Sequence, residues 1–177
     1  MTNRLLGDEP HHLQSVQAEN AAMDRANPVP GSDERWTTVQ ADDGGQPLIV
    51  RIRTDLAKQE LQARWPNRMV VLWRFPAEGP EGSHGLPSTA QQTAMSQFED
   101  AVDAALAAAG VAVLTSVATT RGAREWIWYC GQAPEFNRAF NAGLRGHPRY
   151  PIALRAGPDP AWRQWRGLMA ALGLTPS

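Results

Sequence analysis

The stretch Val111–Cys130, VAVLTSVATTRGAREWIWYC, is the part of the chain that decides the fold. Two apolar runs flank the polar turn Arg121–Arg124, and this pattern predicts a β-hairpin. Helical periodicity precedes the hairpin and follows it. The hairpin is therefore expected at the centre of a β-α-β-β-α-β order that starts near residue 69, and this order predicts an α+β fold.

The helix before the hairpin has clear ends in the sequence. Ser88 is predicted to cap it, with Gln91 three residues on as the partner in a capping box. Gly110 is predicted to end it, because glycine readily adopts the left-handed conformation found after helix C-termini. Glu99 and Asp103 are placed on or near the side away from the apolar stripe. That stripe consists of Met95, Phe98, Val102, Leu106 and Ala109.

The remaining elements are marked by turns and prolines. Pro134 predicts the start of a second long helix, and Asp159 with Pro160 predicts the N-cap and first position of a third. A short helical connection is expected at residues 55–64. Other strands are expected at residues 36–40, 48–53, 69–75 and 150–155, the last at a sheet edge because of Pro151.

These elements predict a ferredoxin-like split β-α-β antiparallel sheet with two helices on one face. The N-terminal β-hairpin, turned at Asp42–Gly45, should extend or flank this sheet, and a C-terminal helix should follow it. Residues 1–33 are polar with sparse apolar positions, which predicts a flexible or peripheral N-terminal segment. Residues 34–177 are expected to form a single α+β domain.

Composition is typical of a globular protein, with 42% hydrophobic and 20% charged residues. No apolar run approaches the length of a membrane span, and the lone Cys130 suits a reducing compartment, so we expect a cytoplasmic protein. The net charge of −1 is unevenly distributed. Residues 1–120 hold 9 Lys and Arg against 15 acids, whereas residues 121–177 hold 8 against 3. Such asymmetry can mark an interaction surface, or the charges can intermix on folding.

With the elements in place, the chain resembles a bacterial family known as domain of unknown function 695. The resemblance covers roughly residues 35–172 and is strongest at Thr120–Trp126, TRGAREW, running into Tyr129. Weaker points are Trp36, the strand Pro47–Arg53, the loop Gly85–Pro87 and the helical Phe98–Asp100. That family is similar in outline to the B-type inhibitors of ribonuclease E. The resemblance implies a ferredoxin-like fold and suggests regulatory binding, but it brings no catalytic residues.

Strand alternation assigns side chains to the two faces of the sheet. In each strand the more apolar set is expected beneath the helices, namely Leu48, Val50, Ile52, Val71, Trp73, Phe75, Trp126, Trp128, Cys130, Ile152 and Leu154. The opposite face is expected to be wet and to present several arginines beside a carboxylate and a phenol. With the nearby Gly/Pro loop at residues 76–87, the predicted binding surface comprises Arg51, Arg53, Arg74, His84, Glu125, Tyr129 and Arg155. Arginine forks suit carboxylates and phosphates, but the same residues can serve only to keep a sheet face soluble.

Several other chemistries find little support. The four histidines and Cys130 lack the spacing of a metal site, and no cofactor fingerprint occurs. Cys130 ends an apolar strand and is interpreted as a core residue rather than a nucleophile. The aromatic pattern of an RNA-binding ferredoxin-like domain is missing, and the charge is too low for nonspecific nucleic-acid binding.

Two hypotheses remain. The first is a non-enzymatic binding or regulatory module that recognises a protein partner through the Arg-bearing sheet face. An inhibitor of a nuclease or toxin is one version, and self-association through the sheet face or an edge strand is another. The second is a small hydrolase or transferase acting on an anionic substrate. In this reading Glu125 or His84 is the acid/base, and Arg53 and Arg74 hold the substrate.

Overall fold

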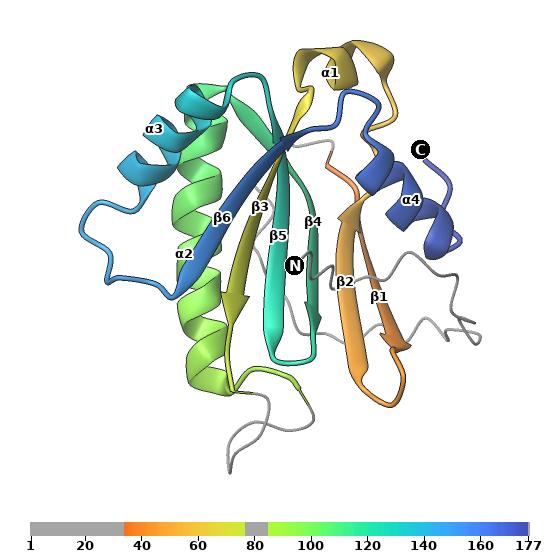
Figure 1. Cartoon of the computed structure of the whole chain (residues 1–177), viewed down its shortest axis with the longest axis vertical. Coiled ribbons are helices and arrows are strands. Elements are labelled where there is room, and N and C mark those ends of the chain that lie inside the picture. The colour runs from red at the N-terminus through yellow and green to blue at the C-terminus, as the bar shows by residue number, and fades with distance from the viewer. Residues whose placement is uncertain (1–33, 77–84, 177) are drawn as a thin grey trace.

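The computed structural model describes residues 34–76 and 85–176, which form an α+β fold with a six-stranded sheet (Figure 1). Every strand pair in the sheet is antiparallel, and the strand order is β1-β2-β4-β5-β3-β6. The predicted N-terminal segment, residues 1–33, and His84 lie outside the described ranges. The strands are β1 Trp36–Asp42, β2 Pro47–Arg53, β3 Asn67–Arg74, β4 Ala112–Thr120, β5 Ala123–Cys130 and β6 Ile152–Pro158. The helices are α1 Gln59–Arg64, α2 Thr89–Ala109, α3 Ala133–Gly143 and α4 Arg163–Ala171.

The central hairpin is confirmed. Arg121 and Gly122 form its tight turn with φ angles of 50° and 70°, both in the left-handed region that such turns require. A β-bulge at Thr115 shifts the register between β4 and β5, and the Thr115 hydroxyl donates to the Ile127 carbonyl at 3.0 Å. The N-terminal hairpin extends the sheet as expected, because β2 pairs with β4.

The predicted ends of α2 and the start of α3 are also confirmed. Ser88 and Gln91 form both bonds of the capping box, and Gly110 ends α2 with a φ of 62°. Pro134 lies in the first turn of α3. The two helices run side by side (Figure 1). They approach so closely at Gly143 that an added Cβ atom would lie 2.7 Å from the carbonyl oxygen of Ala101.

The start of α4 differs from the prediction. The helix begins at Arg163, with Trp162 rather than Asp159 at the N-cap position. Residues 160–162 instead form a turn, which the Trp162 amide closes on the Asp159 carbonyl at 3.0 Å. The Asp159 carboxylate still accepts the first free amides of the helix, from Arg163 at 2.9 Å and Gln164 at 3.0 Å. The capping role is therefore right and the position is three residues too early.

Both faces of the sheet carry a hydrophobic core. On one face, α2 and α3 pack on β3, β4 and β5 around Trp126 and Trp128, which are fully buried beneath the helices as predicted. On the other face, α4 covers a second cluster that includes Ile127 and Tyr129. The two sets alternate along β5, so they point to opposite sides. The face opposite α2 and α3 was expected to be exposed to solvent, and this is wrong for the part that α4 covers.

This second core corrects the face assigned to one strand, β2. Leu48, Val50 and Ile52 are buried as expected, but they lie under α4, not under α2 and α3. The prediction placed the more apolar set of every strand on the α2 side, and in β2 that set belongs to the other layer. Leu154 in β6 is not buried but 38% exposed, because β6 is an edge strand.

Among the described residues, no helix combines the length and apolar character needed to pass through a bilayer.

Candidate functional site

The sheet face that α4 partly covers also carries a group of charged side chains, which we call the Glu125 face: Arg68, Arg74, Glu125 and Arg155. Their common side follows from the strand register. Glu125 pairs with Leu72 of β3, and Arg68, Leu72 and Arg74 share the same parity along that strand. Arg155 of β6 pairs with Val70, which also has this parity. Three strands, β3, β5 and β6, therefore supply one carboxylate and three guanidinium groups.

Glu125 lies at the middle of this face with an apolar surround. Its neighbours in the register are Leu72 on one side and Ala118 on the other, and both are buried. The Glu125 side chain forms no hydrogen bond or ion pair with any described residue. Burial raises the pKa of its carboxyl group, and the nearby Arg68 and Arg155 only partly oppose this shift. The carboxylate is thus held near two cations without being neutralised by direct contact.

The arginines of the Glu125 face differ in how firmly they are held. Arg68 donates to the Gln164 side-chain oxygen of α4 at 3.1 Å, which fixes its guanidinium group at the inner border of the face. Arg74 and Arg155 are exposed, and neither forms a hydrogen bond or ion pair with the described part of the chain. These two side chains are available to an anion from solution, because binding one would break no contact with the described residues.

Tyr129 shares this side of the sheet but is not a surface residue. It is fully buried, its ring stacks on Trp162 at a centroid distance of 4.0 Å, and its hydroxyl donates to Asp159 at 2.6 Å. Burial and the adjacent carboxylate raise the pKa of Tyr129. Burial alone would raise the pKa of Asp159, but hydrogen bonds from Tyr129, Gln164 and Arg163 hold it below its ordinary value. Tyr129 therefore anchors α4 and offers no contact to a partner.

Arg51 and Arg53 lie on the opposite side of the sheet. Arg51 forms an ion pair with Glu99 of α2, and its guanidinium group lies 4.7 Å from the centroid of the Trp36 ring. Arg53 is buried and donates to Asp55 at 3.0 Å and to Glu34 at 2.9 Å. Both arginines are thus held by carboxylates of the chain itself. The predicted surface is divided, and only Arg74, Glu125 and Arg155 of the predicted residues come together.

Sequence reasoning missed a polar cluster beneath α2. Trp126 donates its indole N–H to Glu99 at 2.7 Å, and Trp128 donates to Asp103 at 3.4 Å. Glu99 and Asp103 were expected on or near the outer side of the helix, yet they lie at its border with the sheet. Burial, with smaller effects of nearby Glu34 and Glu99, raises the pKa of Asp103. The available signal was the pair of buried tryptophans, since a buried indole N–H needs an acceptor.

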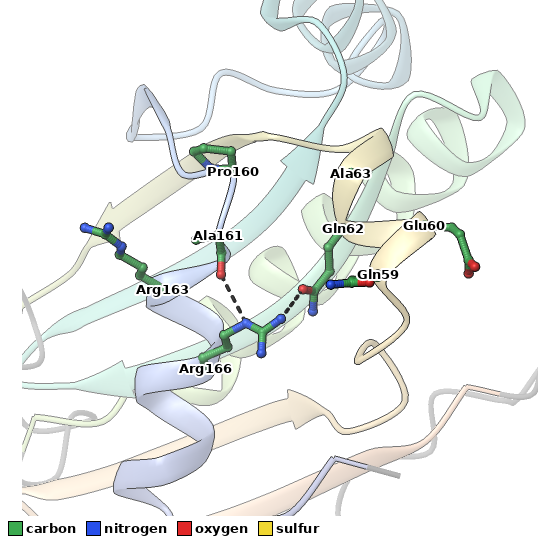
Figure 2. Close-up of a pocket in the computed structure, with 8 residues that line it drawn as sticks. All are labelled: Gln59, Glu60, Gln62, Ala63, Pro160, Ala161, Arg163 and Arg166. Atoms are coloured by element: carbon green, nitrogen blue, oxygen red, sulfur yellow. Dashed lines mark hydrogen bonds between the residues drawn. The ribbon is translucent and has the colours of Figure 1, made fainter.

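A hollow lies between α1 and α4, and none of the residues that line it belongs to the Glu125 face. It has a volume of about 660 Å³ and is open to solvent. Figure 2 shows Arg166 bridging the two helices, with hydrogen bonds to the Gln62 side chain at 2.5 Å and to the Ala161 carbonyl at 3.1 Å. Arg163 projects nearby from the first turn of α4 (Figure 2). The bonds of Arg166 explain how α1 and α4 are joined, and they leave this hollow without a convergent set of reactive groups.

Among the described residues, Cys130 offers no further site. His84 lies outside the described ranges. Cys130 is buried as expected for a core residue, and burial raises its pKa to about 11. A group of three or more metal-binding side chains does not occur within residues 34–76 and 85–176.

Comparison with known proteins identifies the family of the chain. The model of a family described as "Family of unknown function (DUF695)" matches residues 34–168. No curated protein and no solved structure matches the chain.

Proposed function

Because the chain belongs to the DUF695 family, whose function is unknown, we propose its role from the site itself: a non-enzymatic binding or regulatory module that recognises a protein partner. The contact surface in this proposal is the Glu125 face, and the partner group that it receives is acidic. The observation that carries the proposal is the state of Arg74 and Arg155. They are exposed and make no hydrogen bond or ion pair with the described residues, whereas Arg51 and Arg53 are held by carboxylates.

The chemistry of the face supports an acidic partner group. Arg68 and Arg155 act on the Glu125 carboxylate, and Arg74 adds a third positive charge on the same face, so the local formal charge is positive. The buried floor at Leu72 and Ala118 lowers the effective dielectric constant. A guanidinium fork binds a carboxylate through two parallel hydrogen bonds. A bound anion favours the protonated form of Glu125. In that form Glu125 donates a hydrogen bond to the partner group instead of repelling it.

The proposal is tested by reversing the charge of the two exposed arginines. The double variant Arg74→Glu, Arg155→Glu should lose its partners, whereas the matched variant Arg138→Glu, Arg145→Glu on the α3 side should keep them with the same change in net charge. Affinity capture from a lysate of the source organism, followed by quantitative mass spectrometry, measures this. We expect recovery of specific partners to fall at least about tenfold in the first variant only. Partners that the Arg74→Glu, Arg155→Glu variant retains as fully as the wild type would overturn the proposal.

Proton linkage gives a second test with the captured partner. Glu125 takes up a proton more readily when an anion is bound, so affinity should rise as pH falls from neutral towards about 5, above the range where partner carboxylates themselves titrate. Glu125→Gln mimics the protonated state. It should therefore bind more tightly than wild type at neutral pH and show little pH dependence, which isothermal titration calorimetry measures. Equal pH dependence in both proteins would exclude this role of Glu125.

A second candidate function rests on the same residue. The raised pKa of Glu125 beside arginines is also suited to general acid catalysis in a small hydrolase or transferase with an anionic substrate. Turnover of p-nitrophenyl phosphate or p-nitrophenyl acetate that falls about a hundredfold in Glu125→Gln would favour this function. Activity that is missing, or unchanged in Glu125→Gln, would favour the binding module.

We also propose that the fold is ferredoxin-like. In support, β5 lies between β3 and β4, the two strands that α2 connects, and β3 lies between β5 and β6, the two strands that α3 connects. This interleaving is the one a split β-α-β unit produces. An experimental structure with any of these four strands in another order would contradict the assignment. A cytoplasmic location remains a prediction from the sequence.

A further inference from the structure

The free edge of β6 has the properties of a docking strand. β6 is the last strand of the sheet and pairs only with β3 among the described strands (Figure 1). Its central residues Ala153–Ala156 are all exposed, although side chains from both faces of the sheet are included. Leu154 is the one large hydrophobic side chain of the described residues that is exposed, at 38%. Soluble proteins usually protect such an edge, so this one needs an explanation.

The register with β3 tells which backbone groups point outward. In an antiparallel pair, hydrogen-bonded and non-hydrogen-bonded residue pairs alternate. The Asp159 amide bonds to the Pro66 carbonyl at 2.8 Å, and this pair continues the register of β3 and β6. The hydrogen-bonded positions of β6 are therefore the odd-numbered ones, such as Ala153 and Arg155. The backbone groups of Ile152, Leu154 and Ala156 point away from β3, towards the free edge.

The outward backbone groups of two β6 strands can pair with each other in one antiparallel register. We propose that a second copy of this chain pairs its β6 antiparallel to the first, across a two-fold axis at Leu154. Leu154 then faces Leu154 of the second copy, and Ile152 faces Ala156. Leu154 can exchange both backbone bonds with its counterpart, and the Ala156 amide can donate to the Ile152 carbonyl of the other copy, while the Ile152 amide keeps its bond to the Tyr150 carbonyl. Arg155 faces Ala153, which combines a long side chain with a small one and keeps the two arginines apart.

Neighbouring registers are poorer. A shift that centres the pair on Arg155 opposes two guanidinium groups, and it also sets Pro158, which has no N–H, opposite Ile152. A shift in the other direction, centred on Ala153, leaves Ala156 opposite Tyr150, whose carbonyl already accepts the Ile152 amide at 2.9 Å. The centre at Leu154 is the register that sets Leu154 opposite Leu154 and avoids both the arginine pair and the proline.

The resulting dimer has a continuous sheet of two six-stranded halves. A strand-to-strand contact of this length buries a small area, so the dimer belongs to the weak, concentration-dependent class. The Arg155 side chains of both copies project from the side of the sheet that carries the Glu125 face. The pairing itself uses the backbone and Leu154, so it does not depend on what that face binds.

Sedimentation of the full chain, from low micromolar to near-millimolar concentration, tests the proposal. Wild type should pass from 19.4 kDa to twice that mass. Ala156→Pro removes an outward N–H that forms no bond to β3, and it should raise the dimer dissociation constant at least about tenfold. Ala156→Ser is the matched control and should dimerise like wild type, and thermal melting confirms that both variants fold. A chain that stays monomeric, or a dimer that Ala156→Pro leaves intact, would overturn the proposal.

Disulfide trapping tests the register and does not require the proline variant to fold. In the proposed pair, Ala153 of one copy and Arg155 of the other are non-hydrogen-bonded neighbours with Cα atoms about 4.5 Å apart, within disulfide range. Two Ala153 residues, or two Arg155 residues, are separated by about 8 Å, beyond that range. Mixing Ala153→Cys with Arg155→Cys protein under mild oxidation should give mostly mixed dimers. Equal yields of mixed and self-linked dimers would overturn the two-fold register.

Discussion

Glu99 connects side chains from three strands: it contacts Trp126 and Arg51 directly, and Trp36 through Arg51. It accepts the Trp126 indole N–H at 2.7 Å and forms an ion pair with Arg51, whose guanidinium group in turn lies over the Trp36 ring. The acid thus ties α2 to β5 and β2 at the border between core and solvent. A carboxylate with a charged partner and a buried donor is costly to remove, because both partners lose their acceptor.

We therefore expect Glu99→Ala to lower the free energy of unfolding by about 3 kcal/mol. Glu135→Ala, at an exposed position in the first turn of α3, is the control and should cost less than about 1 kcal/mol. Urea denaturation at neutral pH measures both. Similar small losses in the two variants would show that the cluster under α2 adds nothing to stability beyond an ordinary surface charge.

Tyr129 and Asp159 give the chain part of its acid sensitivity. Asp159 has a lowered pKa in the folded protein, so its contribution to stability is present above the unfolded-state pKa of about 4 and is lost as pH falls through the folded-state value. Tyr129→Phe removes the 2.6 Å hydrogen bond that helps to lower this pKa. This substitution should lower the free energy of unfolding by about 2 kcal/mol at neutral pH. The loss should be smaller under acid conditions, where Asp159 is protonated in both proteins.

Urea denaturation of wild type and Tyr129→Phe at stepwise lower pH measures this dependence. The two stability curves should converge as the medium becomes acidic. A constant difference over the whole range would mean that the cost comes from lost packing against Trp162 and not from the charged hydrogen bond.

At the scale of elements, Gly143 sets how closely α2 and α3 pack. An added Cβ atom would lie 2.7 Å from the Ala101 carbonyl oxygen and 2.8 Å from the Ala105 Cβ atom, so the helices would have to separate. Gly143→Ala should therefore destabilise by about 1–3 kcal/mol, although alanine is the better helix former. Gly167→Ala in α4 is the matched control, because nothing lies within 4 Å of its added Cβ atom, and it should stabilise by about 0.5–1 kcal/mol. Thermal denaturation separates the two signs, and a gain in both variants would contradict the close contact.

The elements also show which parts of the fold local sequence can predict. Ser88 and Gly110 act through bonds to near neighbours, and Pro134 acts through its fixed φ angle, so the ends of α2 and the start of α3 could be predicted from the sequence. The order of elements along the chain from β3 onward agrees with the prediction, and β2 extends the sheet by pairing with β4. The start of α4 could be placed only approximately, because the Asp159 carboxylate reaches over a turn to cap the helix.

The candidate site was predictable only in part for a different reason. Alternation along β2 and β5 correctly separates two sets of side chains, but it does not say which helix covers each set. The apolar stripe of α4 gives no sign of the face on which the helix docks. The prediction therefore assigned Val50 to the wrong layer. It also placed Arg51 and Tyr129 on an open face, whereas Arg51 pairs with Glu99 of α2 and Tyr129 is buried under α4. Arg74, Glu125 and Arg155 lie on one face of the sheet, as the alternation along β3, β5 and β6 predicted.

The whole molecule is a sheet with two cores of similar character, and this makes α4 a structural layer rather than an appendage. Trp165 of α4 is 1% exposed, and its indole N–H donates to the Arg53 carbonyl at 2.9 Å. Phe98 occupies the equivalent place on the other side, fully buried and in contact with Trp73 and Trp126. If the two layers are equally necessary, Trp165→Ala and Phe98→Ala should each cost about 3–5 kcal/mol.

The two variants also test whether the layers unfold together. Urea denaturation followed by far-ultraviolet circular dichroism and by tryptophan fluorescence should give one coincident transition for wild type and for both variants. Because β4 and β5 contribute side chains to both cores, loss of one layer removes support from the strands of the other. A cost below about 1 kcal/mol for Trp165→Ala, or an early fluorescence transition confined to that variant, would show that the sheet with α2 and α3 is stable without α4.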